Sequence, residues 1–362
     1  MLFYVLIDDR GRFNFSPAPG VDKLLAGRTK YLSPGLPLGL LQHYFKDLTG
    51  LIDFSPQEVE NKILKRIQKG LRKDKLELEE LVWQESTISH PGRVKCSELY
   101  DRRLFVRFMD LVEGKQFAEG EMAFLAKGLK IERDKVLSLM HKAVLENRGS
   151  WVPALHRHKC SWKCARCGSE NSQEWPSLYG KTATCLGCAS IGVLNSLQVL
   201  FRPKIAMLNK YLELQTSINQ TSYEENLKPL DQSSKLPDSY YKFTPAQSRA
   251  AKELAVFFET TQIKEILVWA ACGAGKTEIC FPLISRHLEE GKKVLFAAPR
   301  QDVVHDVHQR LHKNFPQYRI KLLSGAVPPD LENPLLTVAT THQVLRFYRA
   351  FDLVIFDELD AY

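Results

Sequence analysis

The sequence predicts an α/β domain with a parallel sheet in its last third, preceded by a four-cysteine zinc module and a mixed α/β amino-terminal region. Three observations carry this prediction. A glycine-rich loop follows an apolar run at 265–277, later apolar runs alternate with helical segments, and two pairs of closely spaced cysteines lie at 164–188. Alternation of this kind is typical of a parallel sheet with crossover helices.

A chain of 362 residues is long enough for two or three domains with cores of their own. A polar stretch without apolar periodicity separates the cysteines from the glycine-rich loop and predicts a linker. We therefore expect an amino-terminal region of unknown role at 1–150, a zinc-binding module at 151–212, a linker at 213–243 and the α/β domain at 244–362.

Composition excludes several classes of protein. Charged residues make up 25% and hydrophobic residues 44%, as in ordinary globular proteins, and the net charge of +8 favours a polyanionic partner. The apolar run in 1–10 is too short for a signal peptide and predicts an edge strand, and no run approaches the roughly 18 apolar residues of a membrane span. We expect a cytoplasmic chain, whose eight cysteines are metal ligands or free thiols.

The amino-terminal region contains helical patterns without a recognisable chemistry. Ser55 and Glu58 form a capping box that begins a helix, which we expect to end near Gly70. Its polar face carries a run of Lys and Arg, which fits either a solvated helix face or a contact with a nucleic-acid backbone. Two further helices are predicted at 119–127 and 132–146, and their spacing fits simple helix packing or a helix-turn-helix reader.

The four central cysteines match the spacing of a structural zinc site, with two residues inside each pair and 17 between the pairs. Four thiolates close a tetrahedron around Zn²⁺ and leave no open position. The predicted ligands are Cys164, Cys167, Cys185 and Cys188, while Cys160, His156 and His158 are expected to be bystanders. Aromatic and basic residues around the pairs fit either stacking on a single strand or the small core of a zinc ribbon.

A phosphate-binding loop is predicted after the apolar run 266–270, which we expect to be a buried strand. Gly273 and Gly275 let the backbone curl its N–H groups inward, and the helix after them presents its positive end. We expect Lys276 to contact the β- and γ-phosphates of ATP and the Thr277 hydroxyl to ligate Mg²⁺. Pro282 predicts a kink in this helix, and Cys272 and Cys280 are expected to fill space.

An acidic motif ends the last apolar run. Asp357 is expected to hold Mg²⁺ and Glu358 to orient or deprotonate the attacking water, with Asp360 completing the motif. Both motifs follow apolar strands, at the edge where parallel sheets bind ligands. The strands expected after the phosphate-binding loop are 293–298, 320–323, 335–339 and 352–356. Lys276, Asp357 and Glu358 are the predicted catalytic residues of an ATP hydrolase.

From about residue 241 onward the sequence resembles the first RecA-like domain of superfamily 2 helicases, lacking its last part. Besides the two motifs, the resemblance rests on 298–300, 324–325 and 339–343. It implies that Gln247, which by pattern alone is a helix cap, reads the adenine ring. The nucleotide-binding residues would be Gln247, Gly273, Ala274, Gly275, Lys276, Thr277 and Glu278. The DNA-backbone contacts would be Arg300, Thr340, Thr341 and His342.

Together with the four-cysteine site, 163–362 is more narrowly similar to the late competence proteins of transformable Gram-positive bacteria. The resemblance implies an ATP-dependent single-stranded DNA translocase for DNA uptake. It implies partners among the other competence proteins at the cytoplasmic membrane, a homo-oligomer, and a place in the cytoplasm or peripherally at the inner face of the membrane. Its cofactors would be ATP, Mg²⁺ and Zn²⁺.

In that family a coupling motif and a second RecA-like domain follow the acidic motif, whereas this sequence stops at Tyr362. We therefore expect a truncated motor whose ATP site lacks an arginine finger, a group worth about 10³–10⁵ in rate. Two other functions fit the same residues. One is a replication-restart or repair helicase, and the other is a non-enzymatic zinc-dependent DNA-binding fragment with a vestigial ATP site.

Overall fold

The computed structural model describes residues 1–28, 30–46, 55–76, 78–85, 101–158, 161–204, 243–260, 265–271, 273–325 and 331–358. The predicted linker and Cys160, Cys272 and Asp360 lie outside these residues. The chain forms two compact units. The first comprises Met1–Leu208, Pro328–Leu331 and Leu345–Arg349, and the second comprises Asn209–Val327, Glu332–Val344 and Ala350–Tyr362.

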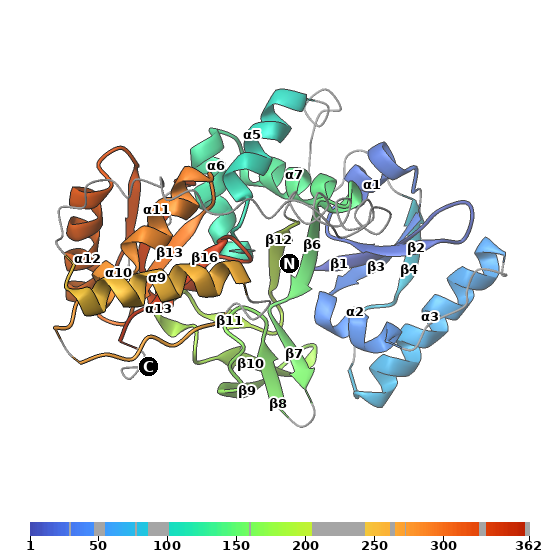
Figure 1. Ribbon diagram of the computed structural model, residues 1–362. Coiled ribbons are helices and arrows are strands. Elements are labelled where there is room, and N and C mark those ends of the chain that lie inside the picture. Colours follow the sequence, from blue (N-terminus) through green and yellow to red (C-terminus); the bar gives the residue numbers. More distant parts are fainter. Residues whose placement is uncertain are drawn as a thin grey trace, which may run out of the picture. The chain divides into compact units, whose positions relative to one another are not determined.

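The first unit begins with an antiparallel sheet of strand order β2-β1-β3-β4 (Figure 1). Its strands are β1 (Phe3–Ile7), β2 (Phe13–Ser16), β3 (Lys30–Leu36) and β4 (Val82–Glu85). The expected first strand is confirmed, but the expectation of an edge strand is wrong because β1 pairs on both sides. Phe3, Leu6 and Ile7 are all almost fully buried, and a strand buried on both faces is stabilised in the interior of a sheet.

Helices α1 (Pro19–Ala26), α2 (Leu38–Phe45) and α3 (Pro56–Lys73) belong to the same part of the chain. The capping box is confirmed, since the Ser55 N–H donates to Glu58 Oε2 at 2.9 Å. α3 continues three residues beyond its expected end at Gly70. Packing explains this, because a Cβ at Gly70 would lie 2.6 Å from the Tyr44 ring, so the glycine permits close contact with α2 inside a continuing helix.

Three helices and one short turn complete the core of the first unit. α5 (Arg102–Val112) precedes the short turn η1 (Glu119–Glu121), α6 (Met122–Leu129) and α7 (Arg133–Leu145). The predicted helices at 119–127 and 132–146 are therefore confirmed within a few residues. α6 and α7 pack on one another, and the side chains of Leu125, Val136 and Leu139 lie in the hydrophobic core, which supports helix packing.

Three small sheets follow. β5 (Phe117–Ala118), β12 (Val199–Pro203) and β6 (Gly149–Pro153) form the first, in the order β5-β12-β6, and β7 (Leu155–His158) pairs with β8 (Ser161–Cys164). The third has the order β11-β10-β9, with β9 (Ser172–Ser177), β10 (Gly180–Cys185) and β11 (Leu194–Asn195); the turn η2 (Ala189–Ile191) lies between β10 and β11. Because β6 and β12 enclose the cysteine segment, this segment and the amino-terminal region share one unit.

The second unit is a parallel sheet of order β14-β15-β13-β16 covered by helices (Figure 1). Its strands are β13 (Val294–Ala298), β14 (Ile320–Leu323), β15 (Leu336–Thr340) and β16 (Leu353–Phe356). Its helices are α9 (Pro245–Thr260), α10 (Lys276–Ile279), α11 (Phe281–Glu289), α12 (Gln301–Asn314) and α13 (Thr341–Val344). All four strands expected after the phosphate-binding loop are confirmed, and the helix before Pro282 is interrupted at Cys280.

Among the described residues, no helix combines the length and the apolar character needed to cross a membrane.

Candidate functional site

The phosphate-binding loop curls through two glycines in the left-handed region, with φ of 76° at Gly273 and 79° at Gly275. A Cβ at Gly275 would lie 2.4 Å from the Gln247 amide nitrogen. This position therefore requires glycine for two reasons, its positive φ and the lack of room for a side chain. Lys276 follows as the first residue of α10, and its Nζ lies 3.4 Å from the Ala270 carbonyl oxygen. The ammonium group therefore stays next to the loop whose N–H groups would receive phosphate.

Gln247 performs the capping role and also contacts the loop. Its Oε1 accepts a hydrogen bond from the Thr244 N–H at 2.9 Å, which is the capping interaction. Its Nε2 donates to the Ala274 carbonyl oxygen at 2.9 Å. One side chain thus fastens the start of α9 to the phosphate-binding loop. The adenine contact implied by the family resemblance stays a prediction.

The acidic motif meets the loop at the end of β16. Thr277 Oγ1 lies 3.4 Å from Asp357 Oδ2, although 80 residues separate them in the sequence. A hydroxyl beside a carboxylate supplies the oxygen ligands that Mg²⁺ prefers, so the residues present fit this cation. Glu358 follows with φ of 54°, and its N–H donates to Asp357 Oδ1 at 3.0 Å. The structure therefore brings together the ends of two motifs that the sequence predicted separately.

The strand predicted at 266–270, directly before the phosphate-binding loop, does not form. The run lies outside the sheet, with Leu267 65% exposed and Trp269 91% exposed. A cleft of about 790 Å³ separates it from β16, the last strand of the sheet, and Lys276, Thr277 and Asp357 line this cleft. An apolar run becomes a strand only where a neighbouring strand accepts its hydrogen bonds, and β16 lies on the opposite side of the cleft.

Two residues near the loop, Glu278 and Cys280, are held inside the second unit. Glu278 accepts a hydrogen bond from Arg310 on α12 at 2.9 Å, and its contact with nucleotide stays a prediction. Burial raises the pKa of Cys280 to about 12, so its thiol is protonated at neutral pH. This supports the expectation that Cys280 fills space and does not react.

The expected DNA contacts share one edge of the sheet. Ala298 and Thr340 are register partners at the carboxyl ends of β13 and β15, so Arg300 and His342 follow adjacent strands. Arg300 forms an ion pair with Asp302, and Thr340 is buried. Of the four candidates, Arg300 and His342 are exposed and Thr341 is partly exposed. A backbone contact by Thr340 through its side chain is therefore disfavoured.

The four cysteines come together although they belong to different strands and turns. Their sulfur atoms all lie within 4.8 Å of one another; Cys164 Sγ is 3.7 Å from Cys188 Sγ, and Cys167 Sγ is 3.5 Å from Cys185 Sγ. A tetrahedron with Zn–S distances of about 2.3 Å requires sulfur separations of roughly 3.8 Å. The donor set and its spacing fit a structural Zn²⁺ ion.

The neighbours of the cluster behave as structural residues. His158 Nδ1 lies 3.3 Å from Glu170 Oε1, away from the sulfur cluster, which agrees with its role as a bystander. The Trp175 indole donates to Thr184 Oγ1 at 2.9 Å, between β9 and β10. The Arg157 guanidinium lies 4.4 Å from the Trp162 ring centre. Because these rings already have partners inside the module, the structure favours the small-core alternative over strand stacking.

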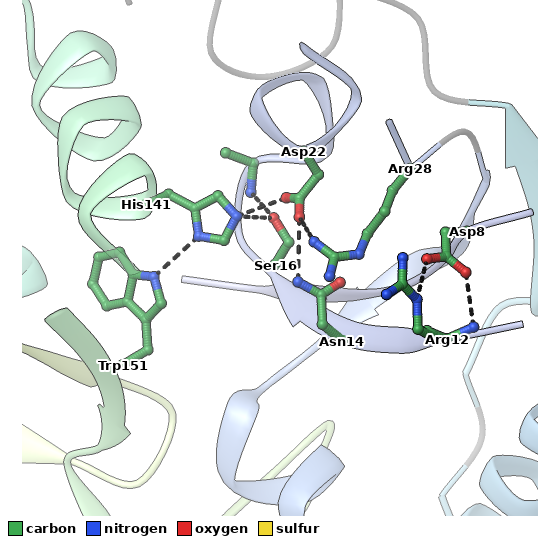
Figure 2. Close-up of polar contacts among 9 residues, drawn as sticks. Asp8, Arg12, Asn14, Ser16, Asp22, Arg28, His141 and Trp151 are labelled. Carbon is green, nitrogen blue, oxygen red and sulfur yellow. Dashed lines mark hydrogen bonds and ion pairs between the residues drawn. The ribbon is translucent and has the colours of Figure 1, made fainter. Parts of the chain in front are cut away.

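A buried Ser–His–Asp cluster in the first unit escaped the sequence analysis (Figure 2). His141 Nε2 lies 2.6 Å from Asp22 Oδ2 and 2.9 Å from Ser16 Oγ, while the Trp151 indole N–H donates to His141 Nδ1 at 3.4 Å. In a nucleophilic triad the serine and the carboxylate contact opposite ring nitrogens, whereas here they share one. All three side chains are fully buried, so we assign the cluster a structural role.

The charge of this cluster is balanced inside the unit. Asn14 Nδ2 and Arg28 Nη1 both donate to Asp22 Oδ1, at 3.2 and 3.0 Å. Burial alone would raise the pKa of Asp22, but the His141 ring and hydrogen bonds from His141, Ser16 and Asn14 outweigh it and lower the pKa below its usual value. No local sequence pattern indicates this cluster, because Ser16 and His141 lie 125 residues apart.

Comparisons with known proteins agree with these observations. Residues 240–359 match the family model described as "Type III restriction enzyme, res subunit". The chain is 33% identical over 211 residues to the competence protein ComFA of Streptococcus pneumoniae, covering 58% of this chain and 42% of that protein. It is 33% identical over 210 residues to ComFA of Bacillus subtilis, covering 57% and 40%. No solved structure matches the chain.

The chain therefore spans about two fifths of the length of the curated relatives that it matches. The matched family region contains the phosphate-binding loop and the acidic motif, and the identity to the competence proteins extends over more than half of the chain. The predicted resemblance is confirmed: the chain is similar to two ComFA proteins over more than half of its length, and 240–359 match a helicase-type family model.

Proposed function

We propose that this chain is the nucleotide-binding part of an ATP-dependent single-stranded DNA translocase for DNA uptake in competence. The observation that carries the proposal is the meeting of Thr277 and Asp357, 3.4 Å apart at the mouth of the phosphate-binding loop. A helicase domain and the identity to two ComFA proteins support the same class of function. The other competence proteins are the expected partners, and the inner face of the membrane is the expected place.

Each side chain has a distinct proposed task. Lys276 holds the β- and γ-phosphates, and Thr277 and Asp357 supply oxygen ligands for Mg²⁺. The cation, when bound, neutralises the charge that develops on the phosphate oxygens. Glu358 accepts a proton from the attacking water. Cys164, Cys167, Cys185 and Cys188 hold a Zn²⁺ ion that stabilises their module.

The test is ATP hydrolysis with and without single-stranded DNA, comparing the chain with Lys276→Ala. We expect DNA to stimulate turnover. We expect the substitution to reduce turnover about 100-fold or more, because the phosphate that is transferred loses its contact with the positively charged lysine. Lys313→Ala is the matched control, since Lys313 is an exposed residue of α12 outside the motifs and its substitution is expected to keep turnover within a few-fold. Turnover that persists undiminished in Lys276→Ala would contradict the proposed site.

A second candidate is a zinc-dependent DNA-binding protein without turnover. The exposure of Trp269 and the separation of 266–270 from the sheet favour it, because the phosphate-binding loop then lacks a rigid strand behind it. The same assay decides between the two. DNA binding that is lost when zinc is removed, with no turnover above the Lys276→Ala level, is the outcome expected for this candidate.

A further inference from the structure

One side of α3 carries six cationic side chains within twelve residues, which we call the α3 basic stripe. Its members are Lys62, Lys65, Arg66, Lys69, Arg72 and Lys73. Their spacing of three and four residues places them along one side of the helix. The other side buries Val59, Ile63, Ile67 and Leu71 in the core of the first unit. The orientation of the stripe is therefore decided by packing.

The carboxylates of α3, Glu58 and Glu60, lie in its first turns, before the stripe. Between residues 61 and 73 there is no Asp or Glu. The acidic residues that flank this segment are already engaged: Glu58 caps the helix, Glu60 Oε1 lies 2.9 Å from Lys30 Nζ, and Asp74 accepts a hydrogen bond from the Tyr44 hydroxyl.

Four of the cations are also free on the surface. Lys65, Lys69, Arg72 and Lys73 are exposed and have no ion-pair partner among the residues that the structure describes. Like charges three or four residues apart destabilise a helix, and a merely solvated helix face usually alternates its charges. This one-sign composition is what an external polyanion would require.

The neighbouring helix α2 is fixed against α3. Arg66 Nε donates to the Tyr44 carbonyl oxygen at 2.8 Å, which holds the end of α2 against α3 (Figure 1). Lys46, the exposed C-cap of α2, follows Tyr44 by two residues. The stripe itself extends over about 16 Å along the helix axis, which is long enough for several successive phosphates.

Two kinds of anionic partner match the charge of the stripe, a membrane surface and a nucleic-acid backbone. A helix that binds a membrane surface inserts its apolar face between the lipids, but the apolar face of α3 is already buried in the protein core. Gln68, the exposed residue between the cations, is polar, as is the exposed Asn61 directly before them. Charge without an apolar face is the pattern of phosphate contacts, which contribute affinity without sequence specificity.

We infer that the α3 basic stripe is a contact surface for the phosphate backbone of single-stranded DNA, separate from the nucleotide-binding unit. The inference rests on the proposed function for the identity of the polymer. It assigns the amino-terminal region a task, which is to hold the strand electrostatically without consuming ATP.

The experiment measures equilibrium binding of the full chain to a fluorescent oligothymidylate of about 30 nucleotides, at salt concentrations between about 50 and 200 mM. The variant replaces Lys65, Lys69, Arg72 and Lys73 by Gln. Each lost phosphate contact reduces the slope of log K against log salt by about 0.7, so four contacts reduce it by nearly 3. We expect that reduction, with at least a tenfold loss of affinity at low salt and an unchanged circular dichroism spectrum.

A matched control removes the same charge elsewhere in the first unit, at the exposed residues Arg102, Arg103, Lys127 and Lys130. Its slope is expected to stay close to that of the unchanged chain. Equal slopes in the two variants would overturn the inference, as would a loss of binding to phosphatidylglycerol vesicles with DNA binding intact. Lys276→Ala separates the two proposals, because it is expected to abolish turnover and to leave the salt slope unchanged.

Discussion

Replacing Cys185 by serine is expected to abolish the proposed Zn²⁺ binding and to unfold the cysteine module, the largest effect that we predict for a single substitution. Apparent free energies of structural Zn²⁺ binding are about 10–16 kcal/mol in zinc-finger peptides, and in such sites binding energy is folding energy. The module has little else to hold it together. Its core cluster is small and consists of three alanines, three leucines and three of the cysteines themselves.

The measurement is zinc content per chain together with hydrogen exchange of the β9 and β10 amides. We expect one equivalent of zinc before substitution, none after it, and a loss of protection confined to β7–β11. Cys280→Ser is the matched control, because it removes a buried thiol outside the cluster and is expected to leave zinc content unchanged. A chain that keeps β9 and β10 protected after complete chelation would contradict a structural role of the metal.

The second large effect is expected from Asp22→Asn, which removes the negative charge between His141 and Arg28. Breaking a buried charged pair by removing one partner costs about 3–5 kcal/mol, since the remaining groups stay buried without compensation. Urea denaturation at neutral pH, followed by tryptophan fluorescence of the first unit, measures this loss. Glu80→Gln is the control, because its side chain is exposed, and we expect a change within about 0.5 kcal/mol.

The stability that Asp22 contributes is also expected to depend on pH. The pKa of Asp22 is lower in the folded state than in the unfolded state, where the usual value is about 3.9. The carboxylate therefore stabilises the fold fully above that value, and its contribution is lost as the pH falls through the folded pKa. We expect the difference between the original chain and Asp22→Asn to shrink as the pH falls below about 4. A difference that grows on acidification would disprove this account.

Motifs made of neighbouring residues were predictable from the sequence, because their chemistry is local. The capping box at Ser55, the glycines of the phosphate-binding loop and the two cysteine pairs each depend on spacings of a few residues. Four parallel strands were also predictable, since apolar runs between polar segments indicate buried strands wherever a sheet is available to receive them.

Relations between distant segments were not predictable in this way. Glu278 pairs with Arg310 on another helix. Gly70 lies inside α3 and does not end it, because this position needs a glycine to make room for the Tyr44 ring. The buried cluster of Ser16, Asp22 and His141 joins residues that carry no common pattern. Pairings of this kind depend on which surfaces the folded chain brings together.

The contrast is sharpest at the two apolar runs that were expected to support the ATP site. Both have the composition of a buried strand, and the residues expected to bind phosphate and Mg²⁺ follow each run directly in the sequence. That 353–356 joins the sheet, while 266–270 stays outside it across a cleft, follows from the fold alone. Strand propensity is a property of the segment, whereas a hydrogen-bonded strand also requires a neighbouring strand.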